Sequence, residues 1–233
     1  MSLASPLSFS IAVMVGLLAG AADDSEGEVE PAERTIALER GDRVLFFGDS
    51  LTAGGIGPDG YVSLVRNALN EKHPDLGLEV EAVATGGHRV PNLLARVDQD
   101  VLARKPTIVF IQIGVNDAAG GVKPEDFKAQ LEELIGRLRD GGAKVILCSL
   151  TSLGEKHDGS NRIDDRLEEL AEVARTVARE QDLPLNDLRK AFVAYWKEHN
   201  ADNLAEGILT YDGNHFNETG QKFVAERMLS KLE

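Results

Sequence analysis

Three residue types in this sequence form a set that can activate a nucleophile: Ser50, Asp212 and His215. A serine hydroxyl is a weak nucleophile at neutral pH, so it needs a base within hydrogen-bond reach, and that base needs an orienting group. Asp212 and His215 stand three residues apart in one loop, so the carboxylate can hold one imidazole nitrogen and direct the other toward Ser50. The set predicts Ser50 as nucleophile, His215 as general base and Asp212 as the group that orients it.

Ser50 is expected at the carboxyl end of a buried strand. The preceding run, Val44 to Phe47, is apolar and too short for a helix, which is typical of a strand covered on both faces. Gly48 ends that run. Asp49 to Thr52 then leave the sheet at the edge where open α/β sheets bind their ligands. The Ser50 hydroxyl is therefore predicted to lie at the mouth of a crevice.

A serine that attacks a carbonyl also needs hydrogen-bond donors for the oxyanion of the tetrahedral intermediate. The sequence offers the backbone N–H of Ser50, a backbone N–H in the turn Gly86-Gly87, and the side-chain amide of Asn116 at the end of a third strand. Two adjacent glycines between a strand and a helix leave backbone N–H groups uncovered. Counting back from the following helix favours Gly87 over Gly86 as the second donor.

Predicted strands and helices alternate along the chain. The expected strands cover residues 44–47, 78–83, 107–113, 144–149 and 183–186, and the expected helices cover residues 61–73, 93–101, 125–139, 163–181, 188–199 and 220–232. This alternation implies right-handed crossovers and helices on both faces of the sheet. The predicted fold class is α/β, a flavodoxin-like three-layer α/β/α sandwich with a mostly parallel five-stranded sheet. The alternating pattern of residues 78–83 indicates an outer strand.

Four short blocks make the chain similar to the SGNH/GDSL hydrolases. They are Gly48 to Leu51 (GDSL), Gly86-Gly87, Gly114 to Asp117 (GVND) and Asp212 to His215 (DGNH). The resemblance covers the chain from Arg43 to Leu232 and implies a serine esterase with the residue roles given above. The second block departs from the family pattern, which usually has an asparagine before the oxyanion glycine, where this chain has Ala84-Thr85.

The α/β-hydrolase arrangement agrees less well with the sequence, although Ser, Asp and His occur in the same chain order. Its nucleophile lies in a strained turn that needs a glycine two residues after the serine. Thr52 occupies that position here. A looser and more open serine site is therefore predicted.

The amino-acid composition limits the kinds of molecule that the protein can bind. The formal net charge of −14 argues against nucleic acid and anionic membrane surfaces, because both select for clustered Lys and Arg. We expect a small-molecule or carbohydrate ester as substrate, and neither cofactor nor metal. The single cysteine, Cys148, lies in an apolar run and is predicted to be buried and unreactive.

The amino-terminal residues predict export. Residues 7–18 are apolar and are followed by Ala19 to Ala22, small residues that suit a signal-peptidase site, so residues 1–22 are interpreted as a signal peptide. The first six residues contain no Lys or Arg, which leaves the α-amino group as the only positive charge there. Residues 23–36 predict an acidic flexible tether, and residues 37–233 the hydrolase domain. The expected location is periplasmic or extracellular, with no stable membrane span after cleavage; an uncleaved segment would act as an anchor, and an N-terminal core helix is the alternative interpretation.

Together these features predict a serine esterase that forms an acyl-enzyme and releases it to water. Small acyl groups, such as O-acetyl on carbohydrate, suit an exported enzyme that lacks a long apolar lid segment. A lysophospholipase or lipid esterase of the same fold is the alternative. A metal-dependent phosphoesterase, suggested by Gly48-Asp49 and Gly213 to His215, would need more convergent ligands than five histidines readily supply. An inactive binding module conflicts with the intact Ser50, Asp212 and His215.

Overall fold

The computed structural model describes residues 30–233, so the predicted signal peptide and residues 23–29 of the predicted tether lie outside the described residues. Residues 31–36, assigned to the tether from the sequence, lie against the domain. The N–H of Leu185 donates to the Pro31 carbonyl (2.7 Å), and Ile36 pairs with Leu232 near the other end of the chain. These backbone contacts hold residues 31–36 against the domain, where the sequence predicted a flexible tether.

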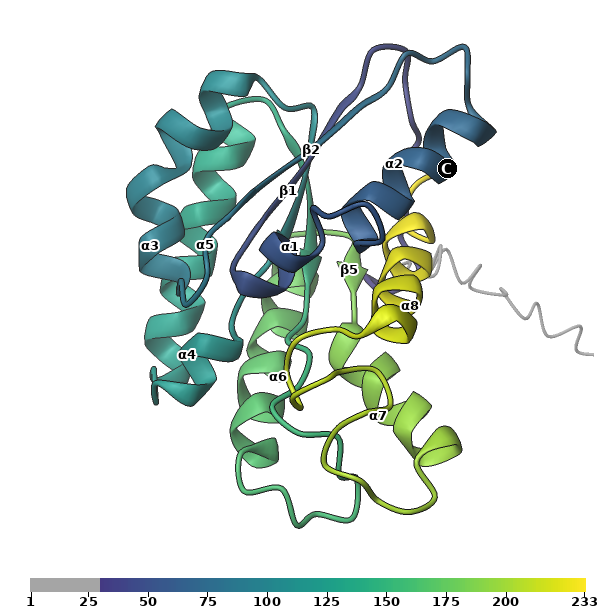
Figure 1. Cartoon of the computed structure of the whole chain (residues 1–233). Coiled ribbons are helices and arrows are strands. Elements are labelled where there is room, and N and C mark those ends of the chain that lie inside the picture. The colour runs from purple at the N-terminus through teal and green to yellow at the C-terminus, as the bar shows by residue number, and fades with distance from the viewer. Residues whose placement is uncertain (1–29) are drawn as a thin grey trace, which may run out of the picture.

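Five parallel strands form one sheet in the order β2-β1-β3-β4-β5 (Figure 1). The strands are β1 (Arg43–Gly48), β2 (Glu79–Ala84), β3 (Ile108–Gln112), β4 (Lys144–Cys148) and β5 (Leu185–Asn186). β1, β3 and β4 are almost entirely buried, as their continuous apolar runs predicted. β2 is an outer strand that exposes Glu79 and Glu81, in agreement with its alternating sequence. The predicted fold class is confirmed.

Helices cover both faces of this sheet, as Figure 1 shows. α2 (Tyr61–Lys72) packs against α8 (Glu218–Leu229) on one side, whereas α3 (Val90–Arg96), α5 (Pro124–Asp140) and α6 (Asp164–Glu180) pack together on the other. α7 (Leu188–His199) contacts α8 through the rings of Phe192 and Phe223, whose centroids are 5.4 Å apart. None of the helices in residues 30–233 is long and apolar enough to cross a membrane.

The helices that follow β1, β2 and β3 differ from the predicted set of helices. The helix expected over residues 93–101 begins earlier, at Val90, because Pro91 is preorganised for the first helical turn. It then loosens into a π-helical turn, Val97–Val101, and a 3₁₀ turn, Leu102–Arg104. Two short helices, α1 (Ser50–Gly54) and α4 (Val115–Ala119), start directly after β1 and β3. They carry Ser50 and Asn116, two of the residues that the sequence assigns to chemistry.

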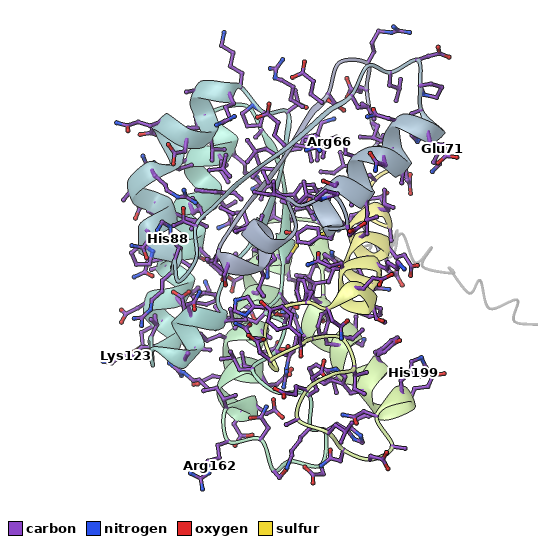
Figure 2. All side chains as sticks on the ribbon, in the orientation of Figure 1. Arg66, Glu71, His88, Lys123, Arg162 and His199 are labelled. Atoms are coloured by element: carbon purple, nitrogen blue, oxygen red, sulfur yellow. The ribbon has the colours of Figure 1, made fainter. Side chains whose placement is uncertain are left out.

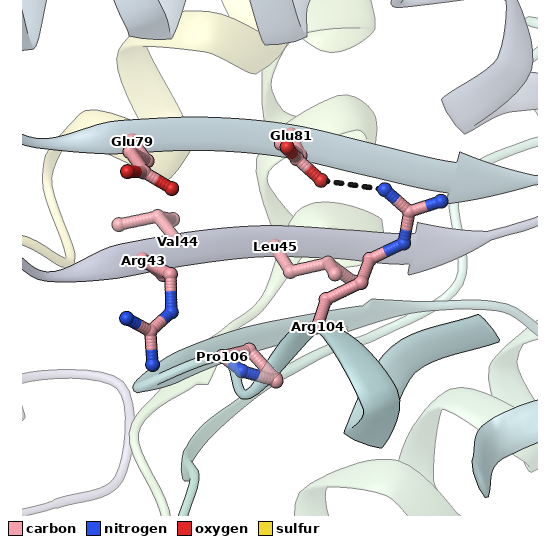
Figure 3. A pocket seen from close by; sticks show the side chains of 7 residues that line it. All are labelled: Arg43, Val44, Leu45, Glu79, Glu81, Arg104 and Pro106. Atoms are coloured by element: carbon pink, nitrogen blue, oxygen red, sulfur yellow. Dashed lines mark hydrogen bonds and ion pairs between the residues drawn. The ribbon is translucent and has the colours of Figure 1, made fainter. Parts of the chain in front are cut away.

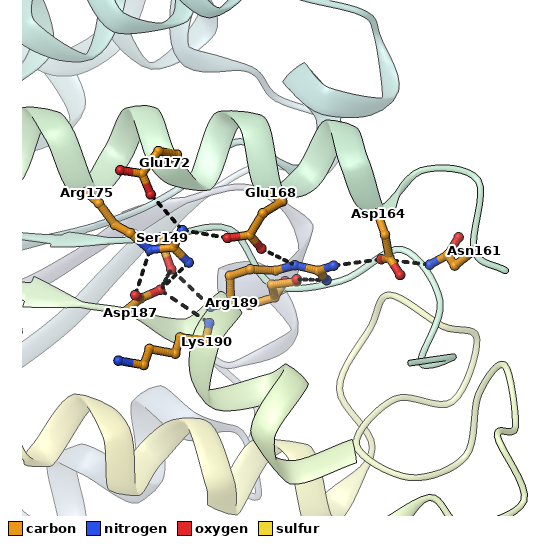
Figure 4. Close-up of polar contacts among 10 residues, drawn as sticks. Ser149, Asn161, Asp164, Glu168, Glu172, Arg175, Asp187, Arg189 and Lys190 are labelled. Atoms are coloured by element: carbon orange, nitrogen blue, oxygen red, sulfur yellow. Dashed lines mark hydrogen bonds and ion pairs between the residues drawn. The ribbon is translucent and has the colours of Figure 1, made fainter. Parts of the chain in front are cut away.

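A network of ion pairs holds the segment that follows β4 (Figure 4). The carboxylate of Asp187 accepts hydrogen bonds from Ser149 (2.7 Å) and Arg175 (2.8 Å), which joins β4 to α6 and the start of α7. Buried Arg189 donates to the Thr151 carbonyl (3.1 Å). These bonds fix the first part of the loop between β4 and α6, which lies next to the loop carrying Asp212 and His215. Cys148, just before this segment, is buried as predicted.

Candidate active site

Ser50 is the first residue of α1, where β1 ends. The side chain of Asp49 caps this helix by accepting a hydrogen bond from the Leu51 N–H (3.0 Å). The first residues of a helix have no intrahelical acceptor for their N–H groups, so the turn presents both the hydroxyl and the N–H of Ser50. Gly48 is required by close packing, since a Cβ there would lie 2.3 Å from Oγ1 of Thr52 and 2.5 Å from the Gln112 carbonyl oxygen.

Asp212 and His215 lie directly beside Ser50. Nδ1 of His215 is 2.7 Å from Oδ2 of Asp212, and Nε2 of His215 is 3.0 Å from Oγ of Ser50. The second carboxylate oxygen of Asp212 accepts from the backbone N–H groups of Asn214 (3.0 Å) and His215 (2.7 Å). Partial burial acts to raise the pKa of Asp212, but these hydrogen bonds outweigh it and hold that pKa below its usual value. The structure thus joins the three residues in one hydrogen-bonded series.

Asn116 approaches the same point from α4. Its side-chain amide donates to Oδ2 of Asp49 (3.2 Å) and to the His88 carbonyl (3.0 Å). The neighbouring Asp117 accepts from the Val90 N–H (3.3 Å). Both carboxyl groups are buried, and burial raises the pKa of Asp49 to about 7 and that of Asp117 to about 6. These two acids tie the loops after β1, β2 and β3 to one another.

The raised pKa of Asp49 makes stability depend on pH. In the folded protein the carboxyl group of Asp49 keeps its proton up to about pH 7, whereas the usual pKa of an aspartate is 3.8. The contribution of protonated Asp49 to the free energy of unfolding is therefore fully present below about pH 4 and is lost as the pH rises through about 7. The loss is roughly 4 kcal/mol at most, since each pKa unit corresponds to about 1.4 kcal/mol. Asp49→Asn cannot ionise. The difference in melting temperature, wild type minus Asp49→Asn, should therefore decrease from about pH 5 to about pH 8; a difference that stays constant across this range would contradict the raised pKa.

The glycine turn lies next to the serine. A Cβ on Gly86 would be 3.8 Å from Cβ of Ser50, whereas one on Gly87 would have no atom within 4 Å. Gly87 has φ of +74°, and the N–H of His88 closes the turn on the Thr85 carbonyl (3.4 Å). A β-turn with positive φ at its third residue favours glycine there. His88, labelled in Figure 2, follows this turn and is half-buried.

A cleft of about 320 Å³ opens beside the serine and the histidine. Its lining residues come from α1, from the Asp212 loop and from α8: Ser50, Leu51, Gly54, Tyr211, His215, Phe216 and Gln221. Tyr211 is 64% exposed, and its ring stacks on the imidazole of His215 at a centroid distance of 5.8 Å. A second groove, of about 460 Å³, shares Gly54, Phe216 and Gln221 with the cleft and extends past Asp59 and Glu218.

Another cavity lies far from these residues (Figure 3). It has a volume of about 240 Å³ and lies at the amino-terminal end of β1 and β2, whereas Ser50 follows the carboxyl end of β1. Arg104 and Glu81 line it and form an ion pair (2.8 Å). None of the residues that the sequence assigns to chemistry lines this cavity. In residues 30–233 there is no group of three or more His, Cys, Asp or Glu side chains that could hold a metal ion.

Residues 46–223 match the model of the GDSL-like lipase/acylhydrolase family. The chain belongs to this family. It is accordingly a hydrolase that acts on ester bonds, and the resemblance based on four sequence blocks is confirmed. Among solved GDSL-family structures, an acetyl xylan esterase, AlAXEase, is similar with a TM-score of 0.78 and 34% sequence identity, over 81% of this chain and 98% of that protein.

Two further relatives match most of this GDSL-family chain. An acetylxylan esterase from Geobacillus stearothermophilus is 27% identical over 214 residues, which cover 82% of this chain and 94% of the relative. The uncharacterized lipoprotein YqeF from Bacillus subtilis is 25% identical over 217 residues, covering 78% of this chain and 86% of the relative.

Two residues near this GDSL-type site were not singled out from the sequence. Tyr211 could have been recognised, because it is an aromatic residue directly before the predicted Asp212. Glu155, a fully buried residue that contacts the loop carrying His215, gives no such signal. A single glutamate in a polar loop looks, in sequence, like any solvated charge.

Proposed function

We propose that this protein is a serine esterase that removes small acyl groups, chiefly O-acetyl groups on carbohydrate, through an acyl-enzyme. The observation that carries the proposal is the continuous series of hydrogen bonds from Asp212 through His215 to Ser50. Since the Nδ1–H of His215 donates a hydrogen bond to the Asp212 carboxylate, Nε2 is left as the acceptor for the serine proton.

In the proposed reaction Oγ of Ser50 attacks the ester carbonyl carbon while its proton moves to Nε2 of His215. The tetrahedral intermediate then breaks the ester C–O bond, and the departing alcohol takes that proton from the imidazolium. Water attacks the acyl group left on Ser50, with His215 again as base, and the carboxylic acid is released. Asp212 keeps its charge throughout and stabilises the imidazolium.

The oxyanion of each intermediate would be held by the N–H groups of Ser50 and Gly87 and by the side-chain amide of Asn116. In the free enzyme both hydrogens of that amide have acceptors, Asp49 and the His88 carbonyl. One bond must therefore be exchanged when the oxyanion forms. Above about pH 7, where Asp49 is ionised, its carboxylate is a stronger acceptor than the neutral carbonyl of His88. We therefore propose that the bond to His88 is the one exchanged and that Asp49 keeps the amide oriented.

The surroundings of the serine support a neutral, hydroxyl-rich leaving group. The cleft is small, and the exposed ring of Tyr211 offers a flat apolar face at its edge. Asp59 and Glu218 line the adjoining groove; Glu218 pairs with Lys222 (2.6 Å), so Asp59 is the carboxylate there that would repel a phosphate or uronate. Two relatives named as acetylxylan esterases support an acetyl group on a polysaccharide over a lipid ester.

The location of the enzyme stays a proposal from the sequence. We propose that residues 1–22 direct export. Because residues 31–36 pack against the domain, the tether proposed between signal peptide and domain shortens to residues 23–30. The naming of the relative YqeF as a lipoprotein supports a cell-envelope setting.

The substrate class is tested at Tyr211. Tyr211→Ala should raise KM for acetylated xylo-oligosaccharides about fivefold, because an aromatic contact contributes about 1 kcal/mol, and should leave KM for p-nitrophenyl acetate within about twofold. Tyr211→Phe keeps the ring and serves as the matched control. Equal rises in both KM values would place the ring against the acyl group. Faster hydrolysis of long-chain than of acetyl p-nitrophenyl esters would favour the lipid esterase alternative.

A further inference from the structure

A fully buried carboxyl group, that of Glu155, holds the loop that precedes the Asp212–His215 pair. Oε1 of Glu155 accepts hydrogen bonds from the N–H groups of Leu209 (2.7 Å) and Thr210 (2.8 Å), and Oε2 accepts from the N–H of Ile208 (2.7 Å). Three consecutive backbone N–H groups thus converge on one carboxylate. Such an arrangement fixes the backbone of those residues, because each buried N–H needs an acceptor.

The backbone of residues 154–155 makes two further hydrogen bonds to the same loop. The N–H of Glu155 donates to the Ala205 carbonyl (2.9 Å), and the N–H of Gly154 donates to the Gly213 carbonyl (2.6 Å). Gly213 lies between Asp212 and His215 in sequence. The contacts of residues 154–155 therefore lie on both sides of Asp212 along the chain.

The hydrogen bond between Glu155 and Thr210 also constrains the segment that carries Asp212 and His215. Thr210 pairs with Phe216 in an antiparallel bridge, so the two ends of the segment 211–215 are held together. Asp212 and His215 lie within that segment, whereas Ser50 belongs to α1. The 3.0 Å contact between Nε2 of His215 and Oγ of Ser50 thus joins two separately held parts of the chain.

We propose that Glu155 is a positioning residue for the serine site: its carboxylate sets the position of the segment 208–210, and through it places His215 within reach of Ser50. This inference rests on the proposed esterase function. A displacement of about 1 Å between reacting groups is enough to lower a rate about 10²-fold, so a loop that shifts slightly will lower kcat without removing the substrate site.

The test compares Glu155→Gln with Glu206→Gln, a matched change at an exposed residue of the same loop. The glutamine keeps one acceptor oxygen but turns an NH₂ group toward a backbone N–H. We expect kcat for p-nitrophenyl acetate to fall about 30- to 100-fold, with KM within about threefold, and Glu206→Gln to stay within about twofold of wild type. Glu155→Asp keeps the carboxylate on a shorter side chain and should lose less than Glu155→Gln.

Proton NMR gives a readout that does not depend on turnover. The Nδ1 proton of His215, hydrogen-bonded to Asp212, should give a downfield signal in wild type and Glu206→Gln that weakens or disappears in Glu155→Gln. A variant with a lower melting temperature but an unchanged signal and an unchanged kcat per folded molecule would overturn the proposal. If Glu155→Gln does not fold, Glu155→Asp is judged by the same two criteria. If the wild type hydrolyses no ester, the proposed function fails, and the NMR comparison alone decides whether Glu155 positions His215.

Discussion

Ser50→Ala should lower kcat for p-nitrophenyl acetate by about 10⁴-fold or more, with KM changed little. The substitution removes the attacking Oγ but keeps the Cβ that lies beside the Gly86-Gly87 turn. The backbone N–H of residue 50 also remains, so part of the oxyanion site survives. Steady-state kinetics of the purified protein, with and without EDTA, measure the effect, and we expect EDTA to leave the wild-type rate unchanged.

Ser230→Ala is the matched control, because Ser230 is an exposed serine at the end of α8. Its rate should equal that of wild type. A Ser50→Ala variant that folds and retains the wild-type rate would show that Ser50 is not the nucleophile. Loss of wild-type activity in EDTA would instead favour the metal-dependent phosphoesterase alternative.

Asp212→Asn should lower kcat by about 10⁴-fold. One oxygen of Asp212 accepts the backbone N–H groups of Asn214 and His215, so the amide oxygen of an asparagine will take that place. Its NH₂ group then faces Nδ1 of His215, which must become an acceptor. The ring proton moves to Nε2, and the imidazole can no longer accept the proton of Ser50.

The matched control is Asp202→Asn, which changes an exposed aspartate in the chain before the same loop. It should keep the wild-type rate, and both variants should keep the wild-type circular dichroism spectrum. A loss of only a few fold in Asp212→Asn would mean that the imidazole keeps its tautomer without the carboxylate. The role proposed for Asp212 would then be wrong.

Much of the architecture could be predicted because its signals are local. A buried strand needs a short apolar run, and β1, β3 and β4 each have one within a residue or two of the predicted bounds. The spacing of Asp212 and His215 is also local, since residues three apart in a turn can contact each other. The 2.7 Å bond between their side chains is the contact that this spacing allows.

The approach of the proposed oxyanion donors to Ser50 depends on the strand order, which no local sequence pattern encodes. β1 lies between β2 and β3, so the segments after those two strands, Gly86-Gly87 and Asn116, flank the serine from both sides. The sequence suggested that these donors share one edge of the sheet. It could not show that the amide of Asn116 already has two acceptors, Asp49 and His88, in the free enzyme.

The sequence by itself determined the family, the fold class and the set of residues that could act together, because each is written in apolar runs, glycine turns and short spacings. Only the tertiary structure decided the contacts between distant segments. Glu155 contacts Thr210, 55 residues later, and Ile36 pairs with Leu232 near the other end of the chain. Such contacts leave no periodic trace in sequence, since they depend on how whole elements pack and on which buried N–H groups still need an acceptor.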